Sequence, residues 1–229
     1  MDDGYFQQFL TLFDEFDVPA AFWVNIQLTV YAGILALLIG TVLATMRISP
    51  VPSLRWAGST YVTVFRNTPL TIIMVFCVLG LWGQLGLTLS QDFTTNFFRL
   101  AVVGLTVYHA DFVCEALRSG VNTVPVGQAE AARAIGLGFW AAARLVILPQ
   151  AFRGAVAPLG NVLIALTKNS TVAAAGSVAE ASGLMRTMIE FRPDVILAIF
   201  LTLAFGFVVL VVPVGLATTS LSRRLAVAR

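Results

Sequence analysis

The chain has 229 residues, of which 58% are hydrophobic and 11% charged, and its formal net charge is +2. Soluble domains carry about 25% charged residues, so this composition excludes an ordinary water-soluble protein. Because apolar stretches recur along nearly the whole sequence, we expect one multi-pass domain in the cell membrane, without a soluble appendage.

The start of the chain, residues 1–21, is acidic and contains no Lys or Arg. A secretory signal begins with basic residues, so we expect the first apolar helix to be retained in the mature protein. The two cysteines, Cys77 and Cys114, both fall in apolar stretches. That setting favours small buried side chains over a disulfide framework or a metal cluster.

A helix needs about 20 mainly apolar residues to cross the hydrocarbon core of a bilayer. The sequence offers five such stretches, at residues 22–46, 62–81, 97–117, 152–171 and 195–218. The fourth is interrupted by Pro158, Asn161 and Lys168, and helices broken at membrane depth pack on protein or line a wet cavity. We therefore predict an all-α bundle of five transmembrane helices over residues 22–222, with the fourth near the pathway.

The basic residues predict the orientation of the bundle, because cytoplasmic loops collect Lys and Arg. The loop after the first span, the segment after the third and the tail at residues 223–229 are rich in arginine. The loop after the second span contains Asp92 and no base, and the loop after the fourth balances two arginines with Glu180, Glu190 and Asp194. This alternation predicts the amino terminus outside the cell and the carboxyl terminus inside.

The segment between the third and fourth spans, residues 120–149, is too polar to cross the membrane but is patterned. Residues 128–135 follow Pro125 and read as a short helix with an acid in its first turn. Gly136 and Gly138 then permit a sharp turn, and a second helix runs from Phe139 toward Pro149, which we expect to end it. Because such short helices are marginal alone, this segment is expected to dock against a partner.

This segment contains three groups of residues at a specific spacing. Glu130-Ala131-Ala132 is followed, after three intervening residues, by Gly136, and Gly136 is followed, after nine intervening residues, by Val146-Ile147-Leu148-Pro149. This pattern resembles the EAA signature of ABC importer permeases. It departs from the signature only by Val146, where the family usually has Ile. A bare EAA triplet means little, but the full spacing between two spans is specific.

Other runs agree with the polar amino acid branch of that family. Arg66-Asn67-Thr68-Pro69-Leu70 resembles its R-G-T-P-L run, with Asn67 in place of Gly, and Lys168-Asn169-Ser170-Thr171 resembles its K-N-T-S run. The likeness is greatest to the glutamate uptake permeases of actinobacteria, through RNTPL, GQAEAARAIGLGF, PLGNVLIALTKN and LSRRLAV. The resemblance covers most of residues 22–222 and implies a type I ABC importer permease for a polar amino acid, with L-glutamate as the first expectation.

The resemblance also implies partners: ABC ATPase subunits, a second permease subunit that is identical or paralogous, and an extracellular substrate-binding protein, with no nucleic acid. Contact with the ATPase would fall to Glu130, Ala131, Ala132, Gly136, Gly138, Leu148 and Pro149. Glu130 could instead be a solvated acid at a helix start. A P-loop requires Gly-Lys followed by Ser or Thr, but the only lysine, Lys168, follows Thr167. We therefore expect no catalytic residue, metal or cofactor in this chain, with ATP and Mg bound by the partner ATPase.

Candidates for the substrate pathway are the polar residues in or beside the spans, namely Asn67, Thr68, Asp111, Asn161, Lys168 and Asn169. Ionisable groups within a membrane face a cavity or a partner, and this applies to Asp111 and to His109, although two residues apart on a helix they do not face each other. Lys168 could neutralise an acidic substrate or serve a structural or gating role. The amides and Thr68 could equally join helices, and Arg99 could reach the outer interface.

Two other classes remain open at this stage. An ion-coupled secondary transporter or channel could use Asp111 and His109, but the sequence shows no inverted repeat and leaves the EAA spacing unexplained. A membrane-embedded enzyme would need a nucleophile, metal cluster or phosphate loop, and none presents itself. Within the importer class, glutamine, aspartate or a basic amino acid are alternatives to glutamate.

Overall fold

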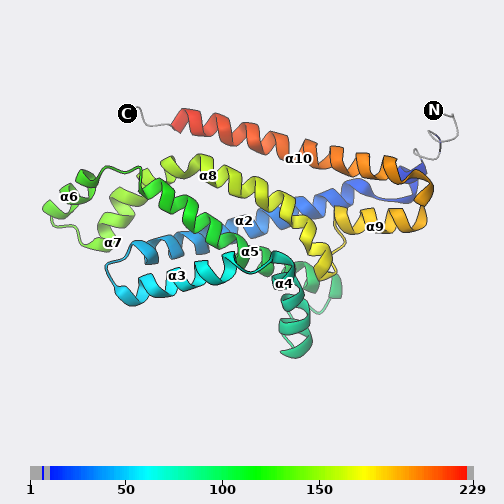
Figure 1. Cartoon of the computed structure of the whole chain (residues 1–229), viewed down its shortest axis with the longest axis horizontal. Helices are drawn as coiled ribbons and strands as arrows, with labels where there is room; N and C mark the ends of the chain where they lie inside the picture. The colour runs from blue at the N-terminus through cyan, green and yellow to red at the C-terminus, as the bar shows by residue number, and fades with distance from the viewer. Residues whose placement is uncertain (1–6, 8–10, 226–229) are drawn as a thin grey trace. The chain divides into compact units, whose positions relative to one another are not determined.

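The structure is a computed structural model that describes residue 7 and residues 11–225 (Figure 1). Within these residues all regular elements are helices, which confirms the predicted all-α fold. The helices are α2 (Val18–Ile48), α3 (Pro52–Arg66), α4 (Leu70–Val75), η1 (Phe76–Gln84), α5 (Phe93–Val121), α6 (Val126–Ala134), α7 (Phe139–Ala142), η2 (Ala143–Ile147), α8 (Leu148–Asn169), η3 (Ser170–Gly176), α9 (Ala181–Phe191), η4 (Pro193–Val195) and α10 (Ile196–Leu225). Parts of the expected amino-terminal segment and tail, residues 1–6, 8–10 and 226–229, lie outside the described residues.

The chain divides into two compact units, which are described separately. The first unit comprises Met1–Ala32, Leu70–Leu105 and Leu166–Pro213. The second unit comprises Gly33–Pro69, Thr106–Ala165 and Val214–Arg229. Residues that we expected in the coupling segment all fall in the second unit.

The core of the first unit joins residues 11–15 and the start of α2 to α9 and the start of α10 (Figure 1). Its buried members are Leu12, Val18, Ala21, Ala181, Met188, Val195, Ile199 and Leu203. Phe22 adds an edge-to-face contact with Phe207, with 5.1 Å between ring centroids. On another side of the same unit η3 packs against α4, where Gly176 lies beside Val78 and Met74.

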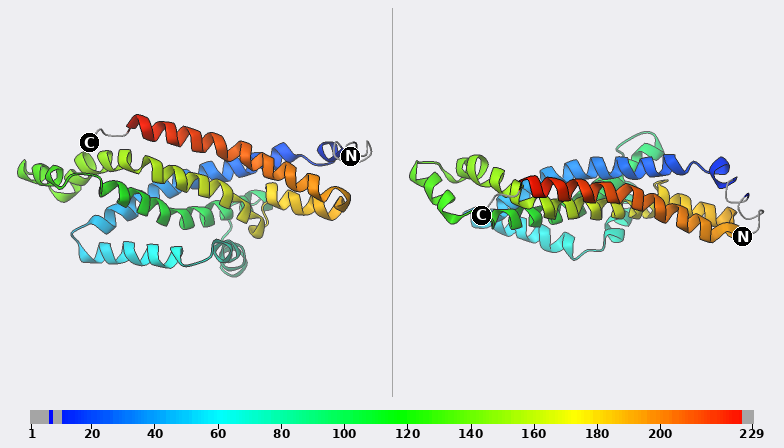
Figure 2. Two further views of the ribbon diagram at one scale, coloured as in Figure 1. Left: turned by 45° about the horizontal axis from the view of Figure 1, so that its top comes forward. Right: turned by 90° about the horizontal axis from the view of Figure 1, so that it is seen from above.

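The core of the second unit is built from small and branched residues of α2, α3, α5 and α8. Its buried members are Ala36, Leu43, Ala44, Val62, Ala110, Val113, Cys114, Leu117 and Ala155. A Cβ at Gly120 would lie 2.2 Å from the Ala151 carbonyl oxygen, so only glycine lets α5 and α8 approach this closely. Close contact through small residues is how helices associate without a hydrophobic driving force in lipid. Figure 2 shows α3, in cyan, returning beside the later part of α2.

Three helices among the described residues are long and apolar enough to cross a membrane, Val18–Ile48, Phe93–Val121 and Pro193–Arg224. The number rises to five if each of two bent helix pairs is one span, in agreement with the predicted five. The predicted second span, residues 62–81, is not continuous, because α3 ends at Arg66 and α4 begins at Leu70. Pro69 explains the break, since proline lacks a backbone N–H and disfavours a helical residue before it.

The expectation that Pro149 ends a helix is wrong. Helical structure continues from α7 through the π-helix η2 into α8, which contains both Pro149 and Pro158. A proline ring normally clashes with the carbonyl four residues earlier. The π-helix Ala143–Ile147 contains Leu145, the residue four before Pro149. Because a π-helix bonds each carbonyl to the N–H five residues later, the helix does not need the N–H that Pro149 lacks.

Candidate functional site

The turn that follows α6 is fixed by a glycine with a left-handed backbone. Gly136 has φ +86°, its N–H donates to the Arg133 carbonyl at 3.0 Å, and the Leu137 N–H donates to the Ala132 carbonyl at 3.0 Å. These two bonds make a Schellman motif, which satisfies carbonyls that the end of a helix leaves unpaired. The expected sharp turn at Gly136 is thus confirmed.

Gly138 behaves differently, because its φ of −67° and ψ of 166° are open to any residue. It precedes α7, and its carbonyl accepts the first helical bond from Ala142 at 2.9 Å. In both views of Figure 2, α6 and α7 form a compact pair of short helices. A mainly apolar cavity of about 440 Å³ lies within this segment and the end of α2, lined by Ile48, Pro50, Ala129, Arg133, Leu137, Gly138, Phe139, Ala142, Ala143 and Ile147.

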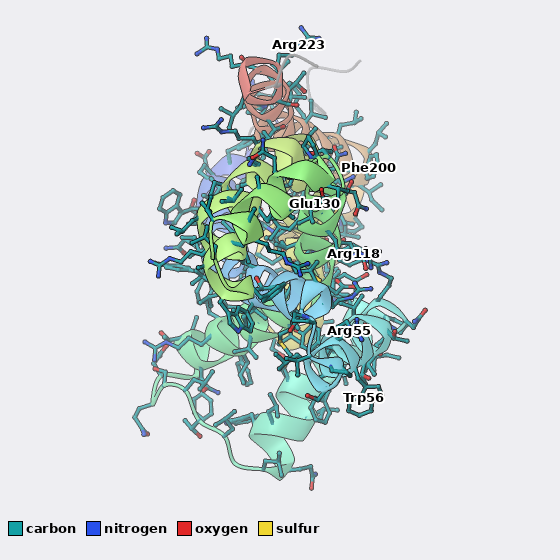
Figure 3. The ribbon with its side chains drawn as sticks, turned by 90° about the vertical axis from the view of Figure 1, so that its left-hand side faces the viewer. Arg55, Trp56, Arg118, Glu130, Phe200 and Arg223 are labelled. Atoms are coloured by element: carbon teal, nitrogen blue, oxygen red, sulfur yellow. The ribbon has the colours of Figure 1, made fainter. Side chains whose placement is uncertain are left out.

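The outer face of the α6–α7 pair carries charged and apolar side chains together. Glu130 and Ala131 are exposed whereas Ala132 is buried, so the EAA triplet presents its acid outward (Figure 3). Ile135 is 78% exposed and Trp140 55% exposed. Exposed apolar side chains rimmed by charge are typical of a docking surface. Leu148 is half-buried and Pro149 exposed at the start of α8.

Helix α5 carries two acids that bind arginines from neighbouring helices of the second unit. Glu115 forms an ion pair with Arg47 of α2, and a longer one with Arg118 at 3.7 Å. Asp111, one turn earlier, is fully buried, and its Oδ2 lies 3.5 Å from the Arg66 Nε at the end of α3. The Arg66 guanidinium also lies over the Phe112 ring, 5.6 Å from its centroid. Asp111 therefore faces a basic partner, which sequence spacing alone did not identify.

The end of α3 uses Asn67 and Thr68 as caps. The Asn67 amide donates to the Thr63 carbonyl at 2.7 Å, and the Thr68 hydroxyl donates to the Val64 carbonyl at 2.8 Å. These bonds pair carbonyls in the last turn of α3 with side-chain donors. Asn67 is exposed and Thr68 half-buried. A role for either in the pathway stays a prediction.

The remaining pathway candidates are divided between the units. Asn161 is exposed on the part of α8 that belongs to the second unit, whereas exposed Lys168 and half-buried Asn169 end α8 in the first unit. The first unit also contains an open cavity of about 680 Å³ between the start of α2 and α9, whose charged lining residues are Asp17, Arg186 and Glu190. None of the described His, Cys, Asp and Glu side chains form a group of three that could hold a metal ion.

The other residues singled out in the sequence have clear surroundings. His109 is buried against the rings of Tyr108 and Phe112, with centroids 5.1 and 6.1 Å away. Arg99 donates to the Leu89 carbonyl. Cys77 and Cys114 are both buried free thiols, as expected.

Asp92, in the loop before α5, caps the start of that helix. The Thr95 N–H donates to the Asp92 Oδ2 at 2.7 Å, and this bond lowers the pKa of the Asp92 carboxyl.

A family model described as the binding-protein-dependent transport system inner membrane component matches residues 32–227. The chain belongs to this family. It is thus a membrane transport subunit, as predicted. Because the family consists of binding-protein-dependent transporters, this finding decides against the ion-coupled transporter and the membrane enzyme.

Named relatives of this permease support the amino acid branch. It is 51% identical over 212 residues to the glutamate transport system permease protein GluC of Corynebacterium glutamicum, covering 90% of this chain and 93% of that protein. It is 33% identical to the probable glutamine ABC transporter permease protein GlnM of Bacillus subtilis, covering 86% and 89% of the two chains.

Solved structures agree on the fold of this permease. A chain in the crystal structure of an amino acid ABC transporter with histidines superposes with a TM-score of 0.79, at 24% identity, over 94% of this chain and 98% of that chain. A chain of the inward-facing MetNI methionine ABC transporter gives a TM-score of 0.72 at 22% identity, over 92% and 96%. These matches confirm the ABC importer permease fold.

The permease has a buried polar cluster that the sequence analysis missed. The Asn25 amide of α2 donates to the Ser170 hydroxyl at 2.8 Å and to the Glu180 carboxylate at 2.9 Å, and it accepts the Ala181 N–H at 3.0 Å. Asn25, Ser170 and Glu180 are all fully buried. Glu180 counted as a loop acid in the sequence, yet its carboxylate caps α9 by accepting the N–H groups of Ser182 and Gly183. The signal available was an amide, one of the two at Asn25 and Gln27, within the first apolar stretch.

Proposed function

We propose that this permease carries L-glutamate into the cell, driven by ATP that a separate subunit hydrolyses. The observation that carries this proposal is the 51% identity to a glutamate transport permease across nearly the full length of both chains. Relatives named for glutamine, arginine or cystine are 31–37% identical, which favours glutamate over those alternatives.

The partners of this permease would be an ABC ATPase, a second permease subunit and an extracellular substrate-binding protein. The α6–α7 pair, with its exposed Glu130, Ile135 and Trp140, has the mixed apolar and charged surface that docking on an ATPase needs. ATP and Mg would bind to the ATPase, and this chain would hold no cofactor of its own.

We further propose the orientation with the α6–α7 pair inside the cell, on the basis of the arginine-rich loops. Single cysteines in a Cys-free background, labelled with an impermeant reagent in intact cells, test it. Gln128 is exposed and suits this purpose better than buried Ala142. Labelling at residue 128 from the outside would contradict the orientation.

Uptake of labelled glutamate tests the cargo. The permease, co-expressed with the ATPase and binding protein of its transport system and reconstituted in vesicles, should import glutamate only when ATP is present on the ATPase side. Competition by unlabelled glutamine, aspartate and arginine measures selectivity. Import of glutamine or arginine without import of glutamate would overturn the proposal, and import driven by a proton gradient without ATP would overturn the mechanism.

A further inference from the structure

The cluster of Asn25, Ser170 and Glu180 lies where three elements of the first unit meet. Asn25 comes from α2, Ser170 begins η3, and Glu180 immediately precedes α9. Between Ser170 and Glu180 the chain passes through a 3-10 helix and then through Ser177, whose φ of +62° is rare for a residue with a side chain. An irregular segment of this kind needs contacts from outside to hold its conformation.

The Asn25 side chain makes hydrogen bonds through both its nitrogen and its oxygen. The amide nitrogen donates one hydrogen bond to the Ser170 hydroxyl and one to the Glu180 carboxylate, and the amide oxygen accepts a hydrogen bond from the Ala181 N–H. Each bond crosses from α2 to one end of the irregular segment, at Ser170 or at Glu180 and Ala181. A single side chain therefore holds both ends of the segment to the same point of α2.

The bond to Ser170 extends to the turn that carries Lys168. The Ser170 hydroxyl donates in turn to the Thr167 carbonyl at 2.7 Å, and the Thr171 hydroxyl donates to the Lys168 carbonyl at 2.8 Å. Lys168 itself is exposed and Asn169 half-buried, whereas Thr167 and Ser170 on either side are buried. The buried bonds of Ser170, together with the exposed bond of Thr171, thus fix the backbone from which the Lys168 side chain projects.

We propose that Asn25 is a positioning residue for transport, which acts by holding the Lys168–Asn169 turn and the start of α9 in one fixed arrangement against α2. The inference rests on the proposed import function and on Lys168 or Asn169 contacting the substrate pathway. Loss of the amide would remove one of the three donors to the buried Glu180 carboxylate, the donor to the buried Ser170 hydroxyl and the acceptor of the Ala181 N–H, so the turn would shift even if the helices stay packed.

The test measures glutamate imported per ATP hydrolysed in vesicles that contain the whole transporter, with its binding protein at saturation. A defect that only lowers the amount of folded permease reduces import and hydrolysis together and leaves this ratio unchanged. We expect Asn25→Ala to lower the ratio about tenfold or more, because small displacements of a positioned group have large effects on rate. An unchanged ratio would overturn the proposal.

Coupling to Lys168 is tested by combining substitutions. If Asn25 acts through the turn, Asn25→Ala should lower the ratio little further in a Lys168→Gln/Asn169→Ala background. Effects that multiply across these variants would show independent roles and overturn the proposal. Thr29→Val is the matched control, since Thr29 is a buried residue one turn along α2 whose hydroxyl donates only to the Asn25 carbonyl of the same helix. Its ratio should equal that of the unmodified permease.

A second substitution keeps the proposal testable if Asn25→Ala fails to fold. Ser170→Ala removes the hydroxyl that accepts from Asn25 at the Lys168 end of the segment, and it leaves the bonds of Asn25 to Glu180 and Ala181 in place. We expect Ser170→Ala to lower the ratio of glutamate imported per ATP hydrolysed as well. An unchanged ratio for Ser170→Ala would overturn the positioning role. If the unmodified permease imports another amino acid instead of glutamate, the proposal for the cargo is contradicted. The role of Asn25 can then still be tested by the ratio of that amino acid imported to ATP hydrolysed.

Discussion

The two units each bury a carboxylate completely, and they stabilise it in different ways. Glu180 in the first unit accepts hydrogen bonds from Asn25, Ser182 and Gly183 at 2.9–3.0 Å. Among the described residues neither oxygen of Asp111 in the second unit has a hydrogen-bond partner, and the nearest charge is Arg66 at 3.5 Å. Dipoles therefore stabilise the first acid and a cation the second.

This difference predicts what each acid does for the protein. A carboxylate that satisfies three donors is part of the local structure, because its removal leaves those donors unpaired. A carboxylate held by one half-exposed arginine at 3.5 Å is a costly buried charge, since desolvation can exceed the attraction of the pair. The first acid should be hard to replace, and the second should be easier to replace than its arginine.

The largest expected loss follows from Glu180→Ala. It leaves one N–H of the Asn25 amide and the backbone N–H groups of Ser182 and Gly183 without an acceptor, and each buried unsatisfied donor costs about 1–3 kcal/mol. We expect a loss of about 3 kcal/mol or more in the free energy of unfolding, measured by thermal unfolding of the purified permease in detergent. Glu190→Ala, at an exposed acid of the same helix α9, is the control. Equal unfolding midpoints for the two variants would contradict the role of Glu180.

The second comparison is between the members of the Arg66–Asp111 pair. Arg66→Met leaves a buried carboxylate without its cation and should destabilise by about 1–3 kcal/mol, less than for a fully buried pair because Arg66 is half-exposed. Asp111→Asn removes the charge itself and should cost under about 1 kcal/mol. In the double variant the loss should be smaller than in Arg66→Met alone. A double-mutant cycle of unfolding midpoints measures this, and larger damage from Asp111→Asn than from Arg66→Met would reverse the interpretation.

A third, smaller effect concerns the glycines of the α6–α7 turn. Gly136→Ala must adopt φ +86° and should cost about 1–2 kcal/mol locally, and Gly136→Val more. Gly138→Ala has an ordinary backbone and should change stability by less than about 0.5 kcal/mol. A Cβ at either position meets no atom within 4 Å, so the contrast isolates the backbone. Hydrogen exchange over residues 126–142 should rise only for the Gly136 variants, and equal exchange for both glycines would exclude backbone strain.

Local chemistry explains which features the sequence predicted. Hydropathy is a property of each stretch by itself, so the apolar helices could be found without knowing their neighbours. The turn at Gly136 was also local, because a Schellman motif is made within six residues. Pro69 could have predicted the break after α3, since the residue before a proline avoids helical backbone. We nevertheless predicted one continuous span at residues 62–81, because the stretch as a whole is apolar enough to cross the membrane.

Long-range pairing explains what the sequence did not predict. Asn25 and Glu180 are 155 residues apart, and Arg66 meets Asp111 only once α3 packs on α5. No spacing rule brings such residues together. The continuation of the helix through Pro149 depends on a π-turn, which has no strong sequence signature. The substrate pathway is the part least accessible to sequence, because polar side chains serve equally as caps or as ligands, and Asn67 and Thr68 cap α3.

The smallest expected effect on folding comes from Glu130, which has no part in either buried arrangement. Its side chain is exposed on α6, so Glu130→Ala should change the free energy of unfolding by less than about 0.5 kcal/mol. If Glu130 meets a basic residue of the ATPase at a partly desolvated interface, truncation should weaken that association by about 2–5 kcal/mol. Copurification of the ATPase and substrate-stimulated hydrolysis in vesicles should therefore both fall, while insertion and unfolding stay normal. Gln128→Ala, another exposed residue of α6, is the matched control. Helix α6 begins at Val126, two residues earlier than predicted, so Glu130 does not lie in its first turn as expected. Normal copurification and hydrolysis for Glu130→Ala would remove this acid from the coupling contact and leave it a solvated side chain on α6.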